Sequence, residues 1–214
     1  MNHAFMLHSL GMKLAILTAT LLAASGAMFA ADPAMTKEER DKALAAFRES
    51  RDQFLRSIAD VNDAQWVWKP APERWSVGLT AEHLVRAEEL LFRSVETAMK
   101  SEPNPDWEKK TAGKIEFLEK IMPTRTGKAQ APFEIVPEGK ISRMEILDRF
   151  DKIRVRALAF TNDVSGPVKN HTVEHPFAIF NTLNAYQWLM YMPWHTERHV
   201  KQIMEVKSSP GYPK

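Results

Sequence analysis

The chain has 214 residues, of which 44% are hydrophobic and 26% are charged, and this is enough for one well-buried core of about 150 to 200 residues. The formal net charge is +2, and Lys and Arg are interspersed with Asp and Glu, so the basic surface that nucleic-acid binding requires is missing. Cysteine is absent, which excludes disulfides, thiolate metal ligands and thiol nucleophiles. Any metal ion must therefore be bound through nitrogen and oxygen.

Residues 1–30 have the pattern of a secretory signal peptide. Lys13 precedes an apolar run from Leu14 to Ala24, and small residues follow at Ser25-Gly26-Ala27 and at Ala30-Ala31. The run is shorter than the roughly 20 residues of a spanning helix, which favours a signal peptide over the alternative, a retained membrane anchor. We expect the mature chain to begin between residues 28 and 32. We also expect a periplasmic or secreted protein with no membrane association beyond export.

Two amphipathic helices are predicted in the first half of the mature chain. Residues 36–61 carry apolar side chains at the helical period, and Thr36 begins a capping box. A loop containing prolines follows. The second helix then begins at Ser76 or Thr80 and extends to about Met99.

The second half predicts a long connection and two more core helices. Prolines interrupt the chain between residues 101 and 137, which leaves room for one short helix at about 107–121. This connection is either a functional lid or a crossover, and we favour the crossover. Core helices are predicted over residues 142–163 and 179–206. The inward residues expected on the first of these are Met144, Leu147, Phe150, Ile153, Ala157, Leu158 and Phe160.

No segment alternates with a period of two for long enough to predict a sheet. The expected fold is therefore all-α, a four-helix bundle in an up-down-down-up arrangement or a variant of it. Its second connection is long and contains the short extra helix. The bundle domain is expected to span residues 36–210, after the signal peptide.

Three histidines lie on predicted inward faces. His195 and His199 are four residues apart, so both imidazoles lie on one face of a helix and can reach one metal ion. His83 falls in the apolar stripe of the second helix. A lone core histidine is usually a hydrogen-bonded structural residue, but three of them bury nitrogens that all need partners. One shared cation would satisfy all three.

Three neutral imidazoles suit a divalent zinc, nickel, iron or copper ion, and the sequence does not select among these metals. Three protein ligands also leave a coordination position for water or substrate, as catalytic sites do. The residue after His195 is Thr196, so the zinc-protease motif is absent. The catalytic residues are not identified.

Other ionisable residues are weaker candidates. His171 and His175 lie beside Pro167 and Pro176, so we expect a loop entering the fourth helix, with His175 at the mouth of the site as the alternative. Glu82, Glu88 and Glu197 are candidate bases or extra ligands, but carboxylates on helical faces are usually solvated. That solvated state is the one we expect.

The chain resembles the DinB/YfiT-like superfamily over about residues 40–210. The resemblance rests on Trp68-Lys69-Pro70-Ala71-Pro72-Glu73-Arg74-Trp75-Ser76, on Glu82-His83-Leu84 and on Asn184 to Leu189 followed by His195-Thr196-Glu197-Arg198-His199-Val200-Lys201-Gln202. It implies a four-helix bundle in which His83, His195 and His199 bind a divalent metal. It also implies a homodimer in many members, and metal-dependent thiol transfer or isomerisation in some. The signal peptide departs from that pattern, because low-molecular-weight thiols are cytosolic cosubstrates.

Three functions remain open at this point. The first is a metal-dependent hydrolase or transferase acting on a small molecule, with the ion as Lewis acid or activator of water. The second is a non-catalytic bundle that binds a metal or a small ligand. The third is a structural metal that cross-links helices. An open metal site lined by Trp or Tyr favours the first, and a fourth protein ligand favours the third.

Overall fold

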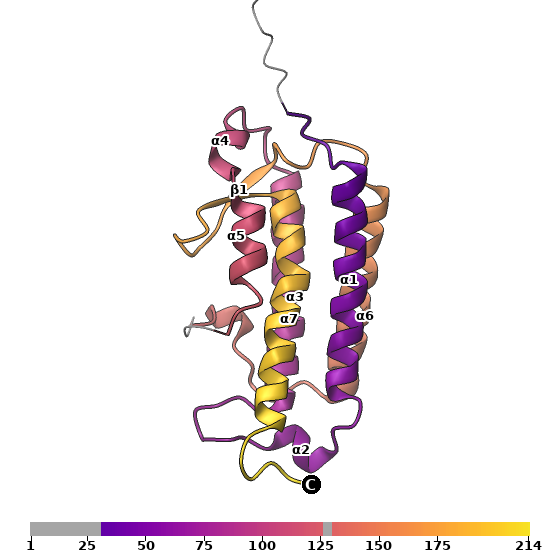
Figure 1. Ribbon diagram of the computed structural model, residues 1–214, viewed down its shortest axis with the longest axis vertical. Helices are drawn as coiled ribbons and strands as arrows, with labels where there is room; N and C mark the ends of the chain where they lie inside the picture. Colours follow the sequence, from indigo (N-terminus) through magenta and orange to yellow (C-terminus); the bar gives the residue numbers. More distant parts are fainter. Residues whose placement is uncertain (1–30, 126–129) are drawn as a thin grey trace, which may run out of the picture. The chain divides into compact units, whose positions relative to one another are not determined.

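Four long helices form the bundle in this computed structural model, which describes residues 31–125 and 130–214 (Figure 1). They are α1 (Lys37–Ile58), α3 (Val77–Met99), α6 (Arg143–Asp163) and α7 (Ala185–Lys207). The signal peptide predicted over residues 1–30 lies outside the described residues. Within the described part of the chain, no helix is both long and apolar enough to cross a membrane.

Helices α1 and α7 run in one direction, and α3 and α6 run in the other (Figure 1). Arg143, at the start of α6, donates to the carbonyls of Ile58 and Val61 at the end of α1. At the opposite end of α1, Arg40 donates to the carbonyl of Val164, just after α6. Both α6 and α7 pack against α1 and α3. The consecutive helices α1 and α3 therefore occupy opposite corners, and a long connection joins the parallel helices α3 and α6.

The caps fix where the helices begin. Thr36 and Glu39 form the predicted capping box of α1, and Ser76 accepts from the amide of Leu79 at the start of α3. The segment expected to be only a loop contains a short helix, α2 (Asp63–Val67), because Asn62 begins another capping box. That cap is the sequence signal the prediction missed.

The long second connection contains more structure than the one short helix predicted. Its first part divides into α4 (Trp107–Thr111) and α5 (Lys114–Ile121), because Gly113 between them adopts a left-handed φ of 70°. A short 3-10 helix, η1 (Phe133–Ile135), follows and packs against α3. The connection thus places part of its backbone beside the second bundle helix.

The segment before α7 differs from the prediction of a helix from residue 179. Two short strands, β1 (Thr172–Glu174) and β2 (Thr182–Asn184), pair antiparallel there. Helix α7 begins at Ala185, because the side chain of Asn184 caps it by accepting from the amide of Gln187. Strands of three residues are too short to leave an alternating pattern, which is why the sequence did not reveal them.

The prediction that Met144 on α6 faces the core was wrong. Met144 is 80% exposed, whereas Ile146, Phe150 and Ile153 are buried. Met144 precedes Ile146 by two residues, about 200° around a helix, and therefore faces the opposite side. The inward stripe of α6 continues instead through Arg154, which is 1% exposed.

The core consists of two apolar clusters separated by polar side chains. On α1 the first cluster contains Phe47 and the second contains Phe54, and on α7 they contain Trp194 and Ile203. The buried polar residues between them are Ser50, His83, Glu88, Arg154, His195, Thr196 and His199, and we refer to this set as the polar layer. Its position midway along the bundle isolates these groups from bulk water.

The close approach of α2 to α3 generates a stability prediction. A Cβ on Gly78 would lie 2.7 Å from Cδ1 of Trp66, whose indole already packs under the guanidinium of Arg143. We expect Gly78→Ala to lower the free energy of unfolding by about 1–3 kcal/mol, because the overlap outweighs the gain in helix propensity. Chemical denaturation measures the change.

Gly166→Ala is the matched control, because its added Cβ would have no neighbour within 4 Å. It should change the free energy of unfolding by less than about 0.5 kcal/mol. Equal effects of the two substitutions would contradict the close packing at Gly78.

Candidate metal centre

The three predicted histidines meet in the interior of the bundle. His195 and His199 are one turn apart on α7, and their Nε2 atoms are 3.1 Å apart. The ring of His83 on α3 lies 4.5 Å from that of His199 and 5.5 Å from that of His195. One nitrogen from each ring lies within 4.8 Å of the other two. The antiparallel packing of α3 against α7 thus brings together residues more than 100 positions apart in the chain.

Hydrogen bonds fix the protonation of two of the imidazoles. Nδ1 of His83 lies 2.8 Å from the carbonyl oxygen of Ile135, and Nδ1 of His199 lies 2.9 Å from Oε1 of Gln202. Both oxygens only accept, so each Nδ1 carries the proton and each Nε2 presents a lone pair. Nδ1 of His195 is buried without a hydrogen-bond partner.

Burial keeps the three rings neutral. It lowers the pKa of His83 to about 4, opposed only by the hydrogen bond to Ile135. Burial also lowers the pKa of His195 and His199 well below the ordinary value, and positive charge on the neighbouring histidines would lower it further. Neutral imidazole is the form that binds metal ions.

These residues fit a divalent metal ion. The Nε2 atoms of His195 and His199 lie 3.1 Å apart, and their lone pairs would repel each other unless a proton or a cation lay between them. Around a tetrahedral ion with bonds of about 2.0–2.1 Å, ligand nitrogens lie roughly 3.3 Å apart. The three ligand nitrogens lie within 4.8 Å of one another here, so a modest adjustment of the side chains would bring them to that spacing.

Aromatic side chains line the cluster, and no fourth ligand joins it. The ring of Trp75 lies 4.7 Å from that of His83, and the ring of Tyr191 lies 6.0 Å from that of His195. Among the described residues, the cluster contains no further His, Cys, Asp or Glu. Neither aromatic residue was singled out from the sequence, although Tyr191 precedes His195 by one helical turn.

The expectation that Glu82 and Glu88 are solvated was wrong, since both are fully buried. Glu82 pairs with Arg86 and accepts from the amides of Glu138 and Gly139, so it fixes the end of the long connection to α3. Neither carboxylate joins the histidine cluster. Glu197 is half-buried and pairs with Lys201 on its own helix.

Glu88 belongs to a hydrogen-bonded network that involves all four bundle helices. Its Oε1 accepts from Nη2 of Arg154 on α6 at 2.8 Å and from the hydroxyl of Thr196 on α7 at 2.6 Å. The Arg154 guanidinium also donates to Thr196 and, on α1, to the carbonyl of Phe47 and the hydroxyl of Ser50. The sequence prediction missed Arg154, although its place in an apolar stripe was a signal.

Glu88 and Arg154 form a coupled pair in which burial opposes both charges. Burial raises the pKa of Glu88, whereas the guanidinium and the Thr196 hydroxyl lower it. Burial likewise lowers the pKa of Arg154, and the carboxylate raises it. The pair is ionised at neutral pH, because a guanidinium with such a partner retains its proton.

His171 and His175 do not join the cluster. His171 lies in an isolated bridge to Pro103, and its Nδ1 pairs with the carbonyl of Ser101. His175 follows β1, stacks on Trp188 at 4.9 Å and accepts from the amide of Phe177. Its ring also lies 5.7 Å from that of Tyr191, so one aromatic residue separates it from His195.

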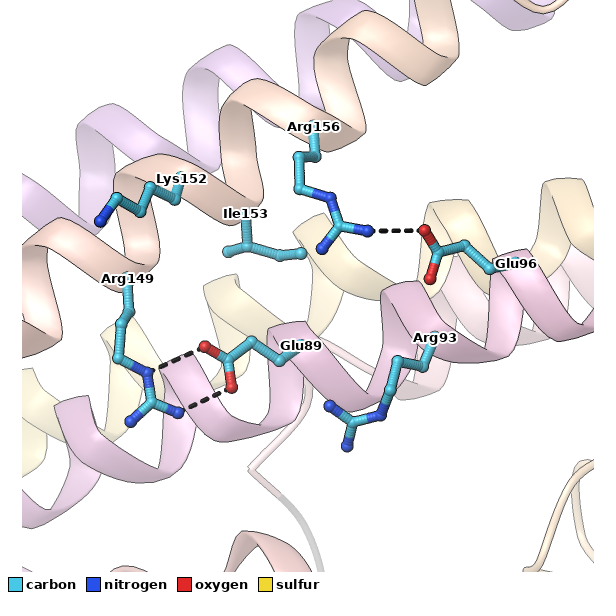
Figure 2. Close-up of a pocket in the computed structure, with 7 residues that line it drawn as sticks. All are labelled: Glu89, Arg93, Glu96, Arg149, Lys152, Ile153 and Arg156. Carbon is cyan, nitrogen blue, oxygen red and sulfur yellow. Dashed lines mark hydrogen bonds and ion pairs between the residues drawn. The ribbon is translucent and has the colours of Figure 1, made fainter.

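A surface groove between α3 and α6 shares no residue with the cluster (Figure 2). Its walls carry two ion pairs between the helices, Arg149 with Glu89 and Arg156 with Glu96. Exposed pairs of this kind contribute only about 0.2–1 kcal/mol each. The groove is therefore explained by helix packing.

Comparison with known proteins agrees with this fold. The family model described as DinB superfamily matches residues 23–203. The "Uncharacterized protein YuaE" of Bacillus subtilis (strain 168) is 22% identical over 165 residues, covering 77% of this chain and 96% of that protein. A solved structure described as "YfiT from Bacillus subtilis is a probable metal-dependent hydrolase with an unusual four-helix bundle topology" matches with a TM-score of 0.59 and 15% identity, covering 86% of this chain and 95% of that one. At this identity the likeness establishes the fold alone.

The environment of His175 generates a prediction about acid stability. Burial lowers the pKa of His175 to about 4 from an ordinary 6.5. Between these values the unfolded chain binds a proton that the folded chain does not, so the folded state loses stability as the pH falls from about 7 to 4. His175→Asn keeps an acceptor for the Phe177 amide but cannot titrate. We therefore expect the unfolding free energy of this variant to depend less steeply on pH, by the equivalent of a fraction of one bound proton.

The measurement is chemical denaturation at a series of pH values, with a chelator present so that metal binding does not contribute. An unchanged dependence on pH in His175→Asn would contradict a neutral, buried His175.

Proposed function

The chain belongs to the DinB superfamily, and from this premise we propose that it is an exported metalloenzyme that binds one divalent ion through His83, His195 and His199. The reaction we propose is metal-dependent hydrolysis, or group transfer, on a small molecule. The metal is zinc, nickel or iron.

One observation carries the proposal: two of the three clustered imidazoles are fixed with a bare Nε2 in a common interior space. The carbonyl of Ile135 holds His83 in this state, and Oε1 of Gln202 holds His199. Histidine ligands of metals characteristically donate the other ring N–H to such an acceptor. The hydrogen bonds that a metal site needs are therefore formed by the protein itself.

The number of protein ligands in the cluster supports an enzyme over a structural cross-link. With three protein ligands, a divalent ion keeps a position for water or substrate and supplies Lewis acidity there. Trp75 and Tyr191 offer aromatic walls to a small molecule. Burial raises the pKa of Tyr191 well above its ordinary value, so its phenol stays protonated and is available to donate a hydrogen bond.

Export supports hydrolysis over thiol transfer. The residues before 31 predict a signal peptide, and a periplasmic or secreted protein would not meet cytosolic low-molecular-weight thiols. The description of YfiT as "a probable metal-dependent hydrolase" is in line with this choice. A homodimer is also proposed, from the family resemblance.

The burial of the histidines favours a second candidate, a non-catalytic metal- or ligand-binding bundle. His83, His195 and His199 are only 3%, 8% and 5% exposed. A substrate would have to reach a site that is largely covered, whereas a small ion would not. Turnover separates the two candidates.

Metal content tests the site directly. The untagged mature protein, purified without chelator, should contain close to one divalent ion per chain. We expect His195→Ala, and likewise the double variant His83→Ala/His199→Ala, to lose it, because removing one neutral imidazole leaves too few ligands in the cluster. Elemental analysis gives the result.

His171→Asn is the matched control, since this histidine lies outside the cluster and should leave the metal content unchanged. The proposed site would be refuted by full metal content in His195→Ala, or by protein without metal even after dialysis against zinc, nickel and iron salts.

Turnover is tested with a panel of small esters, amides and phosphoesters. Activity should disappear when the metal is removed by chelation, return when a divalent ion is added, and be missing in His195→Ala. Full metal binding without turnover on any substrate would favour the binding bundle.

A further inference from the structure

We infer that Glu88, held by Arg154 and bonded to Thr196, is the positioning residue that fixes His195 relative to His83. The inference rests on the proposed metal site and assigns a role to residues outside the three histidines.

The contacts join the two helices that carry the ligands. Glu88 is five residues after His83 on α3, about 7.5 Å along the axis, and it accepts from Thr196, the residue next to His195 on α7. This hydrogen bond sets how far α7 is shifted and rotated against α3 at the level of the cluster. Such a shift is what would change the distances among the three imidazoles.

Arg154 makes this contact rigid. Its guanidinium donates to Glu88 and Thr196, and to Phe47 and Ser50 on α1, and it lies 4.9 Å from the ring of Phe150. A buried carboxylate with one charged partner has few alternative positions. Glu88 therefore cannot move without breaking bonds to the other helices.

The unsatisfied atoms of the polar layer agree with this role. His83 and His199 each have an acceptor for Nδ1, but Nδ1 of His195 has none, although it is buried. Oε2 of Glu88 is also buried without a partner. The one cluster histidine without its own acceptor thus directly precedes Thr196, which belongs to the network, and the network contains an unused carboxylate oxygen.

A structural explanation alone does not account for the arrangement. Replacing a buried ion pair with apolar residues of similar volume is often neutral or stabilising, so packing does not require these charges. The half-buried surface pair Glu89 and Arg149 already links the same two helices (Figure 2). What the buried pair adds is a contact to Thr196, beside a cluster histidine.

The experiment compares the fully buried ion pair between α3 and α6 with a half-buried one at the surface. Glu88→Leu/Arg154→Met removes the buried pair, and Glu89→Leu/Arg149→Met is the matched control. Cobalt(II) is the probe: its affinity is measured by competition with a chelator, and its visible absorption reports the coordination geometry. Circular dichroism and chemical denaturation report folding.

We expect the buried-pair variant to fold, to bind cobalt about 10- to 100-fold more weakly and to show an altered visible spectrum. Glu89→Leu/Arg149→Met should match the wild type in both. Thr196→Val keeps the shape of the side chain and removes the hydroxyl that donates to Glu88, and it should also weaken cobalt binding, which provides the test if the double variant does not fold.

Wild-type affinity and spectrum in Thr196→Val, or in folded Glu88→Leu/Arg154→Met, would overturn the inference and leave the metal site intact. Wild-type protein that binds no cobalt would overturn the proposed function and this inference together.

Discussion

The arrangement of this bundle depends on the burial of one guanidinium. Transferring an arginine and a carboxylate out of water costs several kcal/mol per ion, and only close partners offset that cost. Arg154 finds its partners on α1, α3 and α7 at once. Each of those helices must therefore lie at one rotation and one height. Apolar packing alone tolerates several such arrangements, so the polar contacts restrict the bundle to one of them.

Much of the fold is local and could be predicted from the sequence, whereas the pairing of Glu88 with Arg154 could not. Thr36 and Ser76 cap their helices, and the spacing of apolar residues places the three histidines inward, because both depend on neighbours within a turn or two. The start of α7 was predicted too early, since the cap at Asn184 was not weighed against a continuing apolar pattern. Glu88 was assigned to solvent because its partner Arg154 lies 66 residues further along the chain. Pairing at that separation follows from how the helices pack, which no local pattern records.

The long connection between α3 and α6 belongs to the site as well as to the topology. Two carboxylate oxygens of Glu82 bind the amides of Glu138 and Gly139, and the carbonyl of Ile135 binds His83. The end of the crossover is thus attached to α3 at and beside a cluster histidine. A connection needed only to return the chain to the start of α6 would not require this. The segment is therefore more than the plain crossover that we favoured over a lid. It connects two helices, and it also orients the imidazole of His83.

The polar layer lowers the stability of the metal-free bundle in a way that a bound ion would reverse. Neutral histidines with depressed pKa values bind protons more weakly than the unfolded chain does, and Nδ1 of His195 and Oε2 of Glu88 remain unsatisfied. An ion that binds only the folded cluster adds its binding free energy to folding. The rings of His83 and His199 are already held by hydrogen bonds at Nδ1, so ordering them would cost little of that binding free energy. Buried polar atoms without partners, inside a core that is otherwise well packed, are characteristic of functional sites. Such atoms lower stability, so they persist mainly where function requires them.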